Sequence, residues 1–201
     1  SEAELGISHE ADGIMCLETD LPSGSPISEY FTNVDTQFDL AITPNRPDCL
    51  NHLGIAKELS VMYNTNFKDL AIQKNNAKSS SLPFSLDVKD GSACERFTAS
   101  LIKGVAIAES PDWLKRRLAT IGLRSINNLV DISNYVMFEI GQPMHFYDYD
   151  KIDGAKLIVR SAKDGEVVRT LDDKERTLTS ESTLIEDETK FAGIAGVMGG
   201  K

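Results

Sequence analysis

The sequence predicts a mixed α/β fold in which a small α+β N-terminal piece precedes a larger mixed-sheet part that contains an αα-hairpin. Three observations carry this prediction. Apolar residues recur at helical spacing through residues 110–141, and they recur at the period of two typical of strands after Pro143. A polar stretch near residue 76 divides the chain. The 201 residues are enough for one good core or two small ones.

The N-terminal piece, residues 1–75, is expected to hold two short strands and one helix. Residues 14–17 and 38–42 show strand-like patterns, and residues 21–35 are rich in proline, serine and glycine and predict a loop. The sequence TPNRPDC then ends the second strand, because two prolines remove two backbone donors. Asp48 is the predicted N-cap of the following helix, and Asn64 its end.

The stretch QKNNAKSSS with Leu82 is linker-like, so we place a linker at residues 76–82 and a second domain at 83–201. This domain is expected to begin with strands at residues 84–88 and 96–108, the latter bent at Gly104.

Two helices should follow. Ser110 as N-cap, with Pro111 and Asp112 behind it, predicts a helix start, and Gly122 predicts its end. A second helix is predicted from Ser125 to a glycine cap at Gly141. Only two residues would separate these helices, which favours an αα-hairpin.

Beyond Pro143 the pattern predicts short strands joined by tight turns. The strands are expected at residues 144–147, 156–161, 166–170 and 183–186. The turns are expected at Asp153-Gly154, Asp164-Gly165 and Asp172-Asp173.

Charge and cysteine content limit the function classes. A net charge of -10 argues against a large nucleic-acid footprint. A local cationic group, Lys115, Arg116, Arg117 and Arg124, is compatible either with a small contact to a polyanion or with a solvated helix face. Three scattered cysteines indicate neither disulfides nor zinc, and reduced thiols in a cytoplasm are the simplest interpretation. No residues suggest a metal site.

No self-sufficient catalytic motif is present, because the sequence contains no GxxxxGK[ST], GxGxxG, HExxH or GxSxG pattern. His145 follows a predicted helix and could orient or deprotonate water, or be a hydrogen-bonded structural residue. Arg124, in the predicted interhelical turn, could bind phosphate or carboxylate, or form a cap or a surface ion pair. The glycines of the terminal AGIAGVMGGK imply close backbone approach, for a ligand or for packing.

Three long blocks, in order, resemble the beta subunits of bacterial phenylalanyl-tRNA synthetases. They are FDLAITPNRPDCLNHLGIAKELSVMYN, GLRSINNLVDISNYVMFEIGQPMHFYD, and KIDG with KLIVRSAKDGE and AGIAGVMGGK. The resemblance covers nearly the whole chain. It implies that the N-terminal piece is part of a B1 domain and that residues 83–201 are the first part of a B3/B4 editing domain.

What the resemblance implies about function is specific. The family enzyme attaches phenylalanine to its tRNA in a tetramer of two alpha and two beta subunits. ATP-dependent aminoacylation takes place in the alpha subunit, and the parent enzyme uses ATP and Mg²⁺. Its B3/B4 region hydrolyses tyrosine wrongly attached to tRNA(Phe). By resemblance, His145 is the editing histidine, Arg124 contacts the terminal adenosine of the tRNA, and Gly196 and Gly199 form the wall of the amino-acid pocket. No cofactor is expected in this part of the subunit.

Two departures from the family pattern matter. Phe146 stands where alanine is common, which would alter the pocket rim. A glutamate that recognises the tyrosine hydroxyl, and a threonine and an alanine of the same pocket, are expected beyond Lys201. The isolated chain is therefore expected to have little editing activity. The alternative hypothesis is a non-catalytic scaffold or tRNA-contact module, and an unrelated small-molecule hydrolase would need a triad that the sequence does not contain.

Overall fold

A computed structural model describes the chain except for residues 2, 5–10, 32–35, 73–81, 90–93 and 201. The chain forms two compact units, Ser1–Phe38 and Asp39–Lys201. The described residues of the first unit form one short helix, α1 (Ile27–Tyr30), inside the region predicted as a loop. The strand predicted at residues 14–17 is wrong, because that segment pairs with no strand among the described residues. The predicted linker lies outside the described residues except for Leu82, so the domain boundary there stays a prediction.

A 3₁₀ turn, η1 (Pro47–Cys49), precedes the helix α2 (His52–Met62). Asp48 was predicted as N-cap, and this is wrong. The proline-containing turn continues as η1, so the helix begins later and Asn51 caps it, accepting from Gly54 N at 2.9 Å. The strand predicted at residues 38–42 does not form among the described residues. Asn64 takes φ +49 after the helix, which confirms the predicted end.

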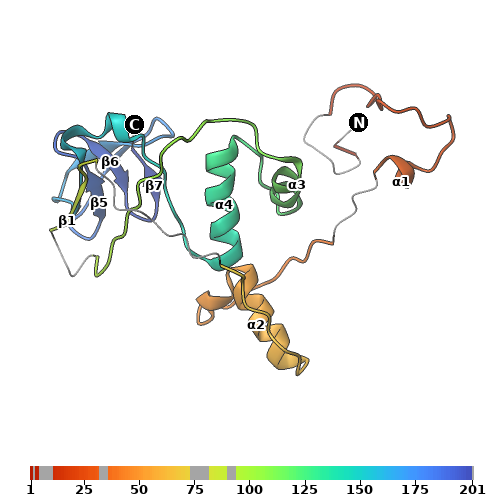
Figure 1. Cartoon of the computed structure of the whole chain (residues 1–201), viewed down its shortest axis with the longest axis horizontal. Coiled ribbons are helices and arrows are strands. Elements are labelled where there is room, and N and C mark those ends of the chain that lie inside the picture. The colour runs from red at the N-terminus through yellow and green to blue at the C-terminus, as the bar shows by residue number, and fades with distance from the viewer. Residues whose placement is uncertain (2, 5–10, 32–35, 73–81, 90–93, 201) are drawn as a thin grey trace. The chain divides into compact units, whose positions relative to one another are not determined.

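The predicted αα-hairpin is confirmed as α3 (Asp112–Thr120) packed against α4 (Asn128–Ile140) (Figure 1). Gly122 and Gly141 have φ +79 and +78, so both predicted glycine ends are confirmed. The predicted starts are wrong. Pro111 is the N-cap of α3, and Asn127 caps α4 by accepting from Leu129 N and Val130 N. The connection between the helices is therefore residues 121–127, longer than the predicted two residues.

A five-stranded mixed sheet has the order β1-β2-β5-β6-β7 (Figure 1). Its strands are β1 (Ser85–Val88), β2 (Lys156–Ser161), β5 (Thr183–Glu186), β6 (Phe191–Ile194) and β7 (Met198–Gly199). Only the β1–β2 pair is parallel. A separate hairpin pairs β3 (Val167–Arg169) with β4 (Glu175–Thr177). Two 3₁₀ turns, η2 (Tyr149–Lys151) and η3 (Asp153–Ala155), lead into β2.

This architecture confirms the mixed α/β class. The predictions at residues 84–88, 156–161, 166–170 and 183–186 are confirmed to within one residue at each end. Those at residues 96–108 and 144–147 are wrong, because neither segment has a strand partner among the described residues. Gly104 has φ +72, so a bend does occur there. The strands β4, β6 and β7 were not predicted.

Two clusters form the core beside the sheet. One consists of Leu157, Val159 and Ile185, and the other of Ala162, Val168, Leu178 and Leu184. In the helical pair the most buried apolar side chains are Leu114 and Leu118, while Trp113 stays half exposed against Tyr135. No helix in the described parts of the chain combines the length and hydropathy that crossing a lipid bilayer requires.

Candidate functional site

His145 lies in the extended segment that follows α4, after Gly141 turns the chain in the left-handed conformation. Its ring meets Tyr147 edge to face, with centroids 4.7 Å apart and an interplanar angle of 68°. Tyr147 packs in turn against the core cluster of Leu157, Val159 and Ile185. The core therefore fixes the ring against which His145 rests.

His145 as a whole is exposed, but Tyr147 and Gly199 cover part of its ring. This burial lowers the pKa of His145 below its ordinary value. A lowered pKa means that the imidazole is neutral near pH 7. A neutral imidazole can accept a proton or orient a water molecule.

Gly199, on β7, lies directly under this ring. A β-carbon at Gly199 would stand 3.0 Å from Cε1 and 3.3 Å from Nε2 of His145, and 2.7 Å from Cδ1 of Leu171. Only a glycine lets both side chains approach the strand so closely. The structure thus brings two of the predicted site residues, His145 and Gly199, into contact.

Gly196 has a different reason to be glycine. It has φ +71 in the turn between β6 and β7, and a β-carbon there would meet nothing within 4 Å. Its requirement is conformational, since few L residues take a positive φ. No contact among the described residues joins Gly196 to His145.

Arg124 lies in the connection between α3 and α4, exposed and without a hydrogen bond or ion pair to the described residues. It precedes α4, whereas His145 follows it, and a helix of 13 residues is about 20 Å long. No contact among the described residues joins Arg124 to His145 or Gly199. Arg124 is therefore a separate part of any site that includes all three.

Asp131, which sequence reasoning missed, holds the segment that carries Arg124. Its carboxylate is fully buried and accepts from Ser110 Oγ and Ser125 Oγ, both at 2.5 Å, and from Ile126 N at 2.9 Å. Burial alone raises the pKa of Asp131, but the hydroxyl and amide donors outweigh it and the pKa is lowered. The carboxylate therefore anchors the residues that directly follow Arg124.

The cationic group is only partly available. Lys115 is paired with Glu109 and, at 3.8 Å, with Asp112. Arg116 and Arg117 are exposed on α3, and the one hydrogen bond of Arg117 to the described residues is to Tyr135 Oη at 3.5 Å. With Arg124, these arginines leave a small local positive charge on an acidic chain.

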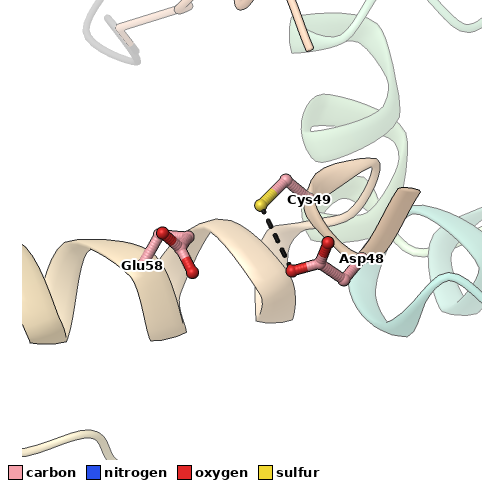
Figure 2. Close-up of side chains that lie close together, drawn as sticks. All are labelled: Asp48, Cys49 and Glu58. Carbon is pink, nitrogen blue, oxygen red and sulfur yellow. Dashed lines mark hydrogen bonds between the residues drawn. The ribbon is translucent and has the colours of Figure 1, made fainter. Parts of the chain in front are cut away.

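A second cluster unites Asp48 and Cys49 of η1 with Glu58 of α2, as Figure 2 shows. These are metal-ligand types, but Arg46 already pairs with both carboxylates, at 2.8 Å from Asp48 and 2.5 Å from Glu58. Burial raises the pKa of Cys49, which favours the thiol over the thiolate that metals bind. We therefore read this cluster as an ion-pair network that ties η1 to α2.

A hollow of about 410 Å³ lies beside the β5–β6 turn. Its lining includes Glu166, Glu186, Lys190 and Phe191, and none of the predicted site residues. Two of its acidic residues, Glu166 and Glu186, already form ion pairs with Arg160. We therefore place the candidate site at His145 and Gly199 instead.

Leu171 is the residue at this site that the sequence reasoning missed. The available signal was an apolar residue within the charged segment TLDDKE, and the structure shows this residue to be exposed. Nothing in the sequence linked that turn to His145, because the contact depends on the pairing of Thr170 with Gly200.

Comparisons with known proteins point to one family. Residues 93–201 match the B3/4 domain. The whole chain is 45% identical to part of a phenylalanine–tRNA ligase beta subunit from Fusobacterium nucleatum. It is 44% identical to the beta subunits from Geobacter metallireducens and Dehalococcoides mccartyi. In each case the alignment covers 100% of this chain and 25% of the relative, so the chain spans about a quarter of the length of these curated relatives.

Proposed function

Because the chain belongs to the B3/4-domain family and its whole length matches a quarter of the length of phenylalanine–tRNA ligase beta subunits, we propose that it is part of such a subunit and serves hydrolytic editing in the intact ligase. The substrate we propose is tRNA(Phe) mischarged with tyrosine. A pocket built for a phenyl ring rejects the same ring carrying a hydroxyl by only about a hundredfold, so a second, hydrolytic site is needed.

The observation that carries this proposal is the placement of the His145 ring over Gly199, steadied by Tyr147. The neutral imidazole is suited to accept a proton from, or to orient, the water that attacks the aminoacyl ester. The described residues around His145 include no activated nucleophile, so positioning of water and ester is the mechanism that fits them. We propose that Gly199, which has no side chain, leaves the space through which the ester reaches the imidazole.

Arg124 supports the tRNA side of the proposal. Its exposed guanidinium, on a segment anchored by Asp131, is suited to the phosphate or terminal nucleoside of a tRNA. The proposed partners are the alpha subunit, in an assembly of two alpha and two beta chains, and tRNA(Phe). ATP and Mg²⁺ would act at the alpha subunit, and the proposed location is the cytoplasm.

The second candidate function is a non-catalytic tRNA-contact module, which the exposed Arg116, Arg117 and Arg124 favour. Deacylation of tyrosyl-tRNA(Phe) by the complete alpha–beta ligase separates the two. We expect His145→Ala to slow deacylation by about a hundredfold or more, the contribution typical of general base catalysis.

The matched control is His52→Ala, which removes a histidine whose Nδ1 hydrogen-bonds to Phe138 O at 2.8 Å. It should leave deacylation near the wild-type rate. If His145→Ala cleared tyrosyl-tRNA as fast as wild type, the editing role of His145 would be refuted and the contact-module function favoured.

A further inference from the structure

Leu171 is an apolar residue in an otherwise charged turn between β3 and β4. Asp172, Asp173 and Lys174 follow it, and 55% of the leucine surface is exposed. An exposed leucine by itself has no significance. This one, however, approaches the same point of the β7 backbone as His145, because both side chains crowd the position that a β-carbon of Gly199 would occupy.

The backbone of Leu171 is joined to the same strand. Its N–H donates to Gly199 O at 3.0 Å, and the preceding Thr170 forms an antiparallel bridge with Gly200. Thr170 is fully buried. The β3–β4 hairpin is therefore attached to the site by its turn, and the hairpin positions Leu171 beside His145.

Hydrogen bonds and an ion pair within the turn also restrain its conformation. Thr170 Oγ1 donates to Asp172 at 2.5 Å and accepts from Arg176 Nε at 3.1 Å, while Arg176 Nη2 pairs with Asp172 at 2.7 Å. The Thr170 N–H donates to Lys174 O at 3.1 Å. With these bonds in place, Leu171 is a preorganised apolar surface.

We propose that Leu171 is a specificity-determining residue of the His145–Gly199 site, where its side chain contacts the aromatic ring of the aminoacyl group while His145 faces the ester. The proposal rests on the editing function proposed above and adds the group that favours a large apolar side chain. The exposed part of the leucine side chain would contact a substrate ring. This contact costs little conformational entropy on binding, because the turn is already ordered.

The test uses the complete ligase and tRNA(Phe) charged either with tyrosine or with alanine, in single-turnover deacylation. Loss of a few methylene-sized groups from an apolar contact lowers discrimination by roughly tenfold or more. We therefore expect Leu171→Ala to slow tyrosyl-tRNA deacylation about tenfold and to leave the alanyl-tRNA rate unchanged, since alanine has no ring to contact. Leu171→Met, which keeps an apolar side chain of similar volume, should restore the tyrosyl rate.

The matched control is Val167→Ala, an equally exposed apolar residue on β3 of the same hairpin (58% exposed). It should change neither rate. Equal loss with both substrates would assign Leu171 a purely structural role and overturn the proposal, as would an unchanged tyrosyl rate in an active enzyme. If wild type and His145→Ala cleared tyrosyl-tRNA equally, the proposed editing role of His145 would fail, and this proposal would fail with it.

Discussion

Replacing Asp131 by alanine tests whether one buried carboxylate holds the helical pair together. Asp131 has no exposed surface and accepts hydrogen bonds from Ser110 Oγ, Ser125 Oγ and Ile126 N. These donors lie before α3 and between α3 and α4, so the carboxylate joins three segments. Alanine removes the acceptor and leaves the Ser110 hydroxyl, at 3% exposure, without its partner.

The expected cost follows from this geometry. A hydrogen bond to a charged group contributes about 1.5–3 kcal/mol, and a buried donor left unpaired costs about 1–3 kcal/mol. Removing the buried charge returns part of its desolvation penalty. We therefore expect Asp131→Ala to lower the free energy of unfolding by about 3 kcal/mol. Asp131→Asn, which keeps the size and one acceptor oxygen, should cost about half as much.

The same residue gives a defined pH dependence. Its folded pKa is lowered, so its contribution to stability is complete above the unfolded pKa of about 3.9 and is lost as the pH falls through the folded value. Asp131→Asn should lose less stability than wild type over that acid range.

Urea unfolding followed by circular dichroism measures both effects. With a slope of about 2 kcal/mol per M, the alanine variant should unfold at a urea concentration about 1.5 M lower. The control is Asp150→Ala, which removes an exposed aspartate and should leave the midpoint unchanged. An Asp131→Ala midpoint equal to that of wild type would refute the anchoring role.

Three further predictions concern other groups. The lowered pKa of His145 should let deacylation persist as the pH drops to 6.5 and decline only below it, in a pH–rate profile of the complete ligase. Arg160→Met should lower the free energy of unfolding by about 2 kcal/mol, because two partly buried carboxylates lose their partner. Arg160 lowers the pKa of Glu166 to about 2. In thermal unfolding, the stability difference between wild type and Arg160→Met should therefore shrink as the pH falls from 5 toward 2. Iodoacetamide at pH 7 should modify exposed Cys16 well before buried Cys49, whose thiol pKa is raised, as peptide mass spectrometry would show.

Helix ends and strongly patterned strands were predictable because their signals are local. Gly122 and Gly141 end α3 and α4 with the positive φ that glycine allows. The strands β2 and β5 were predicted to the residue, because each is a short apolar run bounded by polar residues. Helix starts were less predictable. Asp48 and Ser110 have the right side chains for caps, but Asn51 and Pro111 take those positions.

The wrong strands share a physical cause. Residues 96–108 and 144–147 have strand-like composition, yet a strand exists only when another chain segment pairs with it. Conversely, β6 and β7 are rich in glycine and were not predicted. They form because β5 provides a hydrogen-bonding edge for β6, and β6 provides one for β7.

The candidate site divides along the same line. By itself, the sequence determined the helical pair with its glycine ends and the main strands. It also marked His145, Arg124 and the terminal glycines as candidate site residues. Each of these signals lies within a few neighbouring positions. Only the tertiary structure decided that the side chains of His145 and Leu171 both approach Gly199, while Gly196 and Arg124 lie outside that group. The physical reason is that this contact depends on the pairing of the β3–β4 turn with β7, and such long-range pairing leaves no mark in the residues on either side of it.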